Sequence, residues 1–404
     1  MKGLLKIALG ILTSVGGYLE AGSIGTALQA GAAFRFALLW PIAAGTVCIA
    51  FLVEMSGRLA AVSRHTMVDI MRKRFGVSFH IWPFVAQLVV DLFVLASEIG
   101  GAAMAMQLAF GGSIRVWALP MAVLVWALLW FTSFATIENG VATLGLVTLC
   151  FVVATVQLGP DPHAVASGLV PRLPVSNAAQ YGYLAVGMLG ATISPYLVTF
   201  YSSGAVEEKW SPKDLVANRI VAGIGMSFGG MVSMSVVIVS ALVLAPQGIQ
   251  PESFKDAAGV LRPVFGAGGL YLFAASLGVG CLGAALELAL DLSYLAAQTF
   301  GWEWGEDQEP SHEARFALTY TAALVLAIVP SLLAIDPLKL TMAAMAFTVI
   351  ALPIVIGPLM VIMNDPEYLK THTNGWITNI AVTAIVVLGV ILAIVSIPLQ
   401  FAGS

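Results

Sequence analysis

The chain has 404 residues, of which 59% are hydrophobic and only 10% are charged, whereas a soluble globular protein carries about 25% charged residues. Roughly 20 apolar residues let a helix cross a bilayer, and such stretches recur along the whole chain. The net charge of −4 comes with no basic arm that would bind nucleic acid. These features exclude a soluble enzyme and a nucleic-acid-binding protein. They predict an all-α polytopic membrane protein embedded in the lipid bilayer.

Eleven apolar stretches, separated by short polar connections, predict eleven transmembrane helices. Their expected ranges are about 7–33, 37–62, 80–110, 116–136, 140–159, 179–204, 217–245, 266–300, 314–334, 338–363 and 377–401. No connection is long enough to fold alone, so we expect a single transmembrane domain over 1–404. The three cysteines lie inside apolar stretches without metal-ligand spacing, and we expect no resident cofactor.

The positive charges are distributed unevenly between the two sides. If the N-terminus is cytoplasmic, the inner loops and helix ends hold twelve Lys and Arg residues and the outer ones hold six. Cytoplasmic loops carry an excess of Lys and Arg. We therefore expect a multi-pass protein of the cell membrane with its N-terminus inside and its C-terminus outside.

The first predicted span is interrupted near its middle. The stretch GGYLEAGSIG (16–25) carries Glu20 between glycines, with Ser23 three residues later. An ionisable group at mid-membrane costs at least about 2.5–3.5 kcal/mol on insertion scales and marks a functional site by default. The competing interpretation is a structural carboxyl that binds freed backbone groups. An unbroken helix would not need the surrounding glycines, which favours a functional Glu20.

The sixth predicted span is interrupted in the same way, by the stretch VGMLGATISPYLVTFYSS (186–203). Two interrupted segments at corresponding positions of two halves are the best sequence pointer to a transporter site, because unwound backbone in a membrane must line a cavity or be buried in protein. We expect both spans to be unwound, around 19–23 and 191–195, and to meet at mid-membrane. This predicts an inverted repeat of about 7–159 and 179–363, followed by an extra helix at about 377–401.

The two breaks bring together one carboxylate and several neutral oxygens but no Lys, Arg or His. The candidate ligands are Glu20, Ser23, Ser194, Tyr196 and the freed carbonyls of Gly17 and Ala191. Such a set suits a cation, and hard oxygen donors favour Mg²⁺, Mn²⁺ or Ca²⁺.

Other polar residues lie within the apolar spans. Asp91 and Glu98 are seven residues apart on one face of the third span. They either form a proton relay or are structural carboxyls that accept hydrogen bonds from neighbouring helices. Glu287 and Asp291, on the eighth span, form a second polar lane or hold helices together.

Two further polar features lie near span ends. Glu54 and Arg58, four residues apart, predict a salt bridge. Tyr201 ends the broken sixth span and either lines an inner vestibule or is an ordinary interfacial aromatic.

These motifs resemble the Nramp family of divalent-metal transporters. GYLEAGS (17–23) is similar to that family's Gly-Tyr-hydrophobic-Asp-Pro-Gly-Asn, and GATISPY (190–196) to its Gly-Ala-Thr-x-Met-Pro-His. SEIGGAA (97–103) and LPIVIGPL (352–359) match its third and tenth spans. The resemblance covers nearly the whole chain. It implies the five-plus-five inverted-repeat fold of the amino acid–polyamine–cation superfamily, with helices 1 and 6 broken.

The differences from that family fall on the expected site. The family aspartate corresponds to Glu20, its methionine to Ser194, and its span-10 metal-ligating glutamine to Met345. Tyr196 and Tyr201 stand where it has histidines, and Leu95 stands where it has an aspartate. Similar losses are found in the Nramp-related magnesium transporters, so the resemblance is nearer to that branch.

We therefore expect a secondary transporter of a hard divalent cation, Mg²⁺ or Mn²⁺, with weak or no proton coupling. Glu98, Asp91 and Tyr201 are the candidates for any proton or gating lane. One alternative is a carrier of a small organic solute, with an amine at Glu20 and the solute side chain packed by Tyr196 and Met345. Another is a membrane scaffold or sensor without transport. The sequence leaves the oligomeric state open, and we favour a monomer.

Overall fold

The structure is a computed structural model that describes residues 19–172, 177–305 and 312–402. The regular secondary structure of these residues is all helical, with no strand among them. Ten of the described helical segments are long and apolar enough to cross a membrane. They correspond to the second to eleventh predicted spans. Part of the first predicted span lies outside the described residues.

The helices follow the predicted order. The first span is represented by α2 (Ala21–Phe34). The long spans are α3 (Leu39–Ser63), α5 (Val77–Phe110), α6 (Ile114–Phe131), α7–η1–α8 (Phe134–Gly145, Leu146–Leu149, Cys150–Leu158), α10 and α11 (Ala178–Thr192, Pro195–Glu207), α12–η3–α13 (Leu215–Ile220, Val221–Gly225, Met226–Val243), α15 (Gly269–Phe300), α16 (Ala314–Leu332), α17 (Pro337–Ile362) and α19 (Trp376–Ala402). Short helices α4 (Met67–Phe75), α9 (Pro162–Gly168), α14 (Arg262–Phe265) and α18 (Pro366–Leu369) lie in connections.

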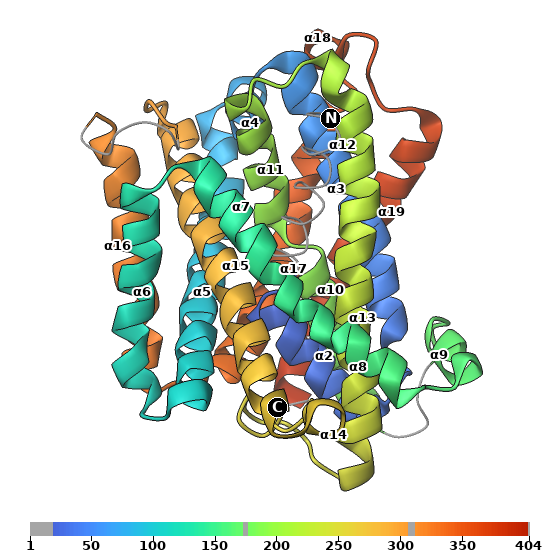
Figure 1. Cartoon of the computed structure of the whole chain (residues 1–404). Coiled ribbons are helices and arrows are strands. Elements are labelled where there is room, and N and C mark those ends of the chain that lie inside the picture. Colours follow the sequence, from blue (N-terminus) through green and yellow to red (C-terminus); the bar gives the residue numbers. More distant parts are fainter. Residues whose placement is uncertain (1–18, 173–176, 306–311, 403–404) are drawn as a thin grey trace.

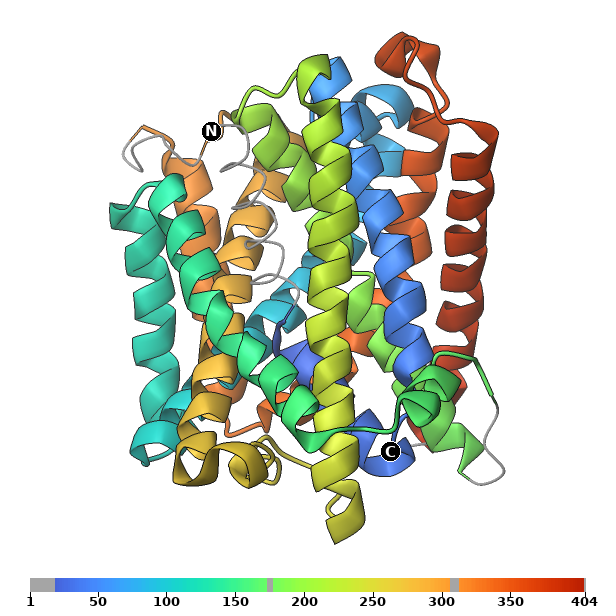
Figure 2. The same cartoon turned by 45° about the vertical axis from the view of Figure 1, so that its right-hand side comes forward.

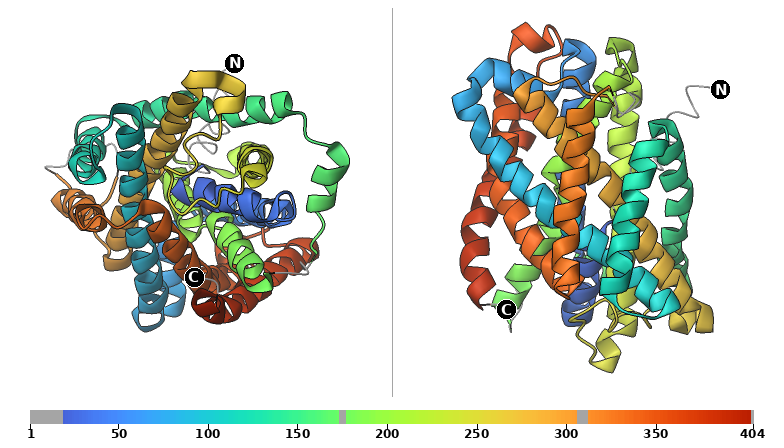
Figure 3. Two further views of the ribbon diagram at one scale, coloured as in Figure 1. Left: turned by 90° about the horizontal axis from the view of Figure 1, so that it is seen from below. Right: turned by 90° about the vertical axis from the view of Figure 1, so that its left-hand side faces the viewer.

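The long helices run side by side and form one bundle. Helices α4 and α18 lie at one end of it, and α9 and α14 lie at the opposite end (Figure 1). Helices α13, α3 and α19 stand next to one another on one side (Figure 2). Seen end-on, α2 lies inside the ring formed by the other helices (Figure 3, left). The described part of the first span is therefore enclosed by protein.

Helix α2 packs against α13, α10 and α17, and α5 packs against α15, α17 and α16. The interior is made mainly of Leu, Ile, Val, Ala and Met side chains, and most of the buried polar side chains are Ser and Thr. The buried carboxylates Glu20, Asp91, Glu98 and Asp291 stand out, because a buried charge is costly unless it is paired.

The break in the sixth span is set by Pro195. Proline fixes its own φ and disfavours helical backbone at the preceding residue. Accordingly, α10 ends at Thr192, Ser194 is extended (φ −83°, ψ 121°), and α11 begins at Pro195. Pro195 also has no N–H to donate to the carbonyl of Ala191 four residues earlier.

The breaks are shorter than the sequence predicted. Glu20 is extended (φ −97°, ψ 176°), but the helix starts at the next residue, where the N–H of Ile24 already donates to the Glu20 carbonyl at 3.0 Å. Residues 21–23, 191, 192 and 195 are helical rather than unwound. The prediction of 19–23 and 191–195 was too wide, because each helix begins at the first position from which backbone hydrogen bonds between residues four apart can form.

Candidate functional site

The two breaks meet at Glu20 and Tyr196. The Tyr196 hydroxyl, in the first turn of α11, donates a hydrogen bond to Glu20 Oε2 at 3.4 Å. Glu20 is 1% exposed and Tyr196 is fully buried. A carboxylate is thus held where α2 begins and beside the break between α10 and α11, inside the bundle.

Two oxygens at this junction have no partner. Neither Glu20 Oε1 nor Ser194 Oγ makes a hydrogen bond within the described structure, although both are buried. Buried polar groups in native proteins are nearly always paired, and an unpaired one calls for a water, an ion or a functional role. The unpaired oxygens point to a polar or charged ligand.

Met345 of α17 lies on the same side of Gly22 as the Glu20 carboxylate. A Cβ added to Gly22 would come within 2.9 Å of Met345 Sδ and 3.1 Å of Glu20 Oε1. The thioether and the carboxylate therefore both lie close to Gly22. Three predicted ligands thus come from three places in the fold. Glu20 directly precedes α2, Tyr196 belongs to α11 and Met345 to α17.

Helices α5 and α15 hold the first break in place. The N–H of Ala21 donates to Glu98 Oε2 of α5 at 3.0 Å. A Cβ on Gly280 of α15 would lie 2.0 Å from the Leu19 carbonyl oxygen, so only glycine allows this close approach. Glu98 therefore binds the backbone next to Glu20, which is the alternative that the sequence left open beside a proton relay.

The other predicted site residues are placed differently. Gly17 lies outside the described residues. Ser23 and Ala191 are buried helical residues of α2 and α10. Tyr201 packs edge-on against Trp210, at 5.6 Å between ring centroids, away from the breaks.

Asp91 belongs to a separate polar cluster. It lies beside Asp291 of α15, where Gln87 and Thr199 also converge. Gln87 and Thr199 did not stand out in the sequence. The one available signal for Gln87 was its position one helical turn before Asp91.

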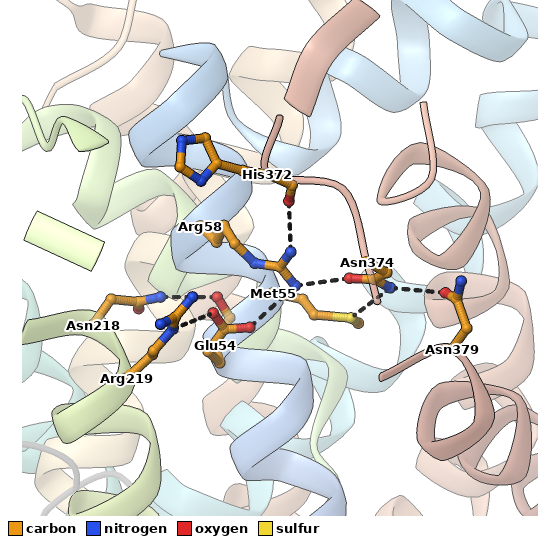
Figure 4. A network of polar contacts seen from close by, with 8 residues as sticks. All are labelled: Glu54, Met55, Arg58, Asn218, Arg219, His372, Asn374 and Asn379. Atoms are coloured by element: carbon orange, nitrogen blue, oxygen red, sulfur yellow. Dashed lines mark hydrogen bonds and ion pairs between the residues drawn. The ribbon is translucent and has the colours of Figure 1, made fainter. Parts of the chain in front are cut away.

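The predicted salt bridge of Glu54 and Arg58 is present, at 3.2 Å, within a wider network (Figure 4). Arg58 donates to the His372 carbonyl at 2.6 Å and to Asn374 Oδ1 at 2.7 Å, and Arg219 lies 3.6 Å from Glu54. The network ties α3 to α12 and to the connection between α18 and α19. An open cavity of about 440 Å³ beside it is lined by both arginines, which does not suit a cation.

The described residues contain no group of three His, Cys, Asp or Glu side chains that would hold a metal ion. The junction instead offers one carboxylate, hydroxyls and a thioether. Magnesium keeps several waters when bound by one or two carboxylates. Such a junction can hold a cation that retains part of its water shell.

Comparisons with known proteins place this geometry in context. The model of the family described as "Natural resistance-associated macrophage protein-like", Nramp, matches residues 10–398. The chain is 25% identical over 391 residues to the divalent metal cation transporter MntH of Deinococcus radiodurans, covering 91% of this chain and 85% of that one.

Solved structures agree in fold. The manganese transporter of Eremococcus coleocola superposes with a TM-score of 0.82 at 20% identity, over 98% of this chain and 87% of that one. Mhp1, a nucleobase-cation-symport-1 family transporter, superposes with a TM-score of 0.61 at 14% identity, over 98% of this chain and 92% of that one. With a family model that spans nearly its whole length, the chain belongs to the Nramp family.

Proposed function

We propose that the protein is a secondary transporter of a divalent metal cation, Mg²⁺ or Mn²⁺, which binds at Glu20. The observation that carries the proposal is the buried Glu20 carboxylate beside the break in the sixth span, whose Oε1 has no hydrogen bond among the described residues. A fully buried carboxylate without an ion-pair partner in a membrane protein needs a counter-charge. The relatives named as divalent metal cation transporters support a metal ion as that charge.

The ligands favour Mn²⁺ over Mg²⁺. Glu20, Ser194 and Tyr196 supply oxygens, which suit both ions. Met345 adds a thioether at the same point, from which Mg²⁺ gains nothing, whereas a softer transition metal gains a ligand. A predominantly hard site with one sulfur therefore prefers manganese while admitting magnesium.

The protein is proposed to reside in the cell membrane with its N-terminus in the cytoplasm, as the loop charges predict. Proton coupling is proposed to be weak or absent. The positions that resemble the family's span-6 histidines are Tyr196 and Tyr201. Histidine is the usual proton switch near neutral pH.

Uptake into proteoliposomes tests the proposal. Wild type, Glu20→Gln and the control Glu367→Gln, at an exposed position of α18, are assayed with Mg²⁺, Mn²⁺ and Ca²⁺ and with a panel of amino acids and amines. We expect saturable divalent-cation uptake by wild type and by the control, and none by Glu20→Gln. Saturable uptake of an amino acid or amine without any cation uptake would establish the organic-solute carrier instead. No uptake of either kind would favour the scaffold.

A further inference from the structure

A second pair of carboxylates is buried away from Glu20. Asp91 of α5 and Asp291 of α15 are both fully buried. Their carboxyl groups lie side by side, because Gln87, one turn before Asp91 on α5, donates to Asp291 at 2.9 Å. None of the ion pairs formed by the described residues involves either of them. Two carboxylates in contact cannot both stay ionised without a positive charge between them.

Neutral polar groups surround the pair unevenly. Asp291 accepts hydrogen bonds from the Thr199 hydroxyl, at 3.0 Å, and from the Gln87 amide, at 2.9 Å. Asp91 accepts none on either oxygen within the described structure. Asp91 is therefore a fully buried carboxylate without a hydrogen bond, next to one that is hydrogen-bonded. A ligand bound between the two would supply the missing partner.

The pair is linked to the Glu20 site through α11. Thr199 lies one turn after Tyr196 and donates to the Tyr196 carbonyl at 3.0 Å. Helix α11 runs from the break towards the end of the bundle that carries α4 (Figure 1). The loop charges predict that this end is cytoplasmic. The pair thus lies between the Glu20 site and the predicted cytoplasmic end.

We propose that Asp91 and Asp291 form a second binding site for a hard divalent cation, which a transported ion occupies between Glu20 and the cytoplasm. The proposal rests on the proposed function. Two carboxylates balance one divalent charge, and the Thr199 hydroxyl adds a further oxygen donor, so the set contains no sulfur. This is the donor set that Mg²⁺ and Mn²⁺ take. Compared with the junction beside Met345, the second site discriminates less against Mg²⁺.

A single proton shared by the two carboxyls would relieve the same repulsion, and this is the alternative that an experiment has to separate. A shared proton cancels one of the two negative charges, whereas a divalent cation cancels both. They differ in stoichiometry, because only a cation site adds a bound metal ion to each chain.

The experiment counts Mn²⁺ bound to the purified full-length protein by equilibrium dialysis and calorimetry. The variants are Glu20→Gln, Asp91→Asn, and both combined, with Glu367→Gln as the control. Asp91→Asn removes a carboxylate that accepts no hydrogen bond from the described residues, so it leaves existing contacts in place. Asp291→Asn, which keeps an oxygen for Thr199, is a second variant in case the first does not fold, and thermal melting verifies both.

We expect about two Mn²⁺ per chain for wild type and the control, about one for each single variant, and none for the combination. One Mn²⁺ in wild type, lost in Glu20→Gln and retained in Asp91→Asn, would overturn the second site in favour of a shared proton. The proposed function would then stand. Absence of Mn²⁺ and Mg²⁺ binding in wild type would overturn both.

Discussion

The carboxylate of Glu98, on α5, accepts a hydrogen bond at 3.0 Å from the backbone N–H of Ala21. Ala21 is the first residue of α2, and the first N–H groups of a helix have no partner within that helix. A side chain 77 positions away in the sequence therefore fixes where the second half of the first span begins. Because Glu20 immediately precedes this helix, we expect Glu98 to help to position the neighbouring carboxylate.

Replacing Glu98 by alanine should therefore reduce cation uptake. Leaving a buried donor unpaired or losing a hydrogen bond to a charged group costs about 1.5–3 kcal/mol, which corresponds to roughly 10- to 150-fold in binding. Glu98→Gln keeps an oxygen for the Ala21 N–H and should retain most uptake. The measurement is KM and maximal rate in proteoliposomes. Equal loss in Glu98→Ala and Glu98→Gln would mean that the charge matters, not the hydrogen bond.

Cation uptake should not acidify the liposome interior. Tyr196 lies at the junction, where a histidine would serve as proton switch, and a tyrosine hydroxyl in water ionises only near pH 10. A pH-sensitive dye trapped inside the liposomes provides the measurement, and an added proton ionophore is the control for leakage. Acidification that scales with uptake and vanishes in Glu98→Gln would contradict the prediction and make Glu98 the relay.

The sequence predicted the spans and both breaks because their signals are local. Proline disfavours helical backbone at the residue before it, which predicts the break at Pro195, and a glutamate among glycines in an apolar stretch is visible without a structure. Met345 was predicted only through the family resemblance. The inverted repeat of about 7–159 and 179–363 stays a prediction.

The polar cluster at Asp91 could not be predicted in full from the sequence. Gln87 donates to Thr199 across 112 positions and to Asp291 across 204. No periodicity links residues so far apart, and a threonine in an apolar span usually bonds to its own helix. The pairing of Glu98 with Ala21 was hidden for the same reason, since it depends on how α5 crosses the start of α2.

Metal preference should follow the number of thioethers. Ser194→Met places a second sulfur at the junction and should shift the preference further towards Mn²⁺, because Mg²⁺ gains nothing from sulfur. Met345→Gln removes the sulfur and supplies an amide oxygen, so it should shift the preference towards Mg²⁺. Competition of Mg²⁺ against Mn²⁺ uptake measures both changes. Opposite changes of the Mn²⁺ preference in the two variants would support a metal ion at the junction. Changes in the same direction would show that the preference depends only on side-chain volume.

The network around Glu54 and Arg58 should contribute to stability rather than to transport selectivity. Arg58 is 6% exposed and bonds to Glu54, His372 and Asn374. Removing one partner of a buried pair costs about 3–5 kcal/mol, so Arg58→Ala should lower the melting temperature clearly. The matched control is Arg219→Ala, since the Arg219 side chain is 65% exposed and pairs with the same glutamate at 3.6 Å. Its loss should cost about 0–1 kcal/mol. An equal effect of the two variants would argue against the network.

Glu20→Gln tests the central claim. The substitution keeps the size of the side chain and its hydrogen bond to the Tyr196 hydroxyl, but it removes the full charge at the junction. At an effective dielectric near 20, a carboxylate and a divalent ion about 2.5 Å apart attract by roughly 13 kcal/mol before desolvation is subtracted. The net loss is far smaller, yet it should abolish saturable binding of Mg²⁺ and Mn²⁺ at any practical concentration.

Calorimetric titration of both ions against wild type, Glu20→Gln and Glu20→Asp provides the measurement. Glu20→Asp keeps the charge and restores the residue that the family motif carries, so it should retain cation binding. Unchanged binding in Glu20→Gln would remove this carboxylate from the site, because no neutral amide can replace a counter-charge for a divalent ion inside the bundle.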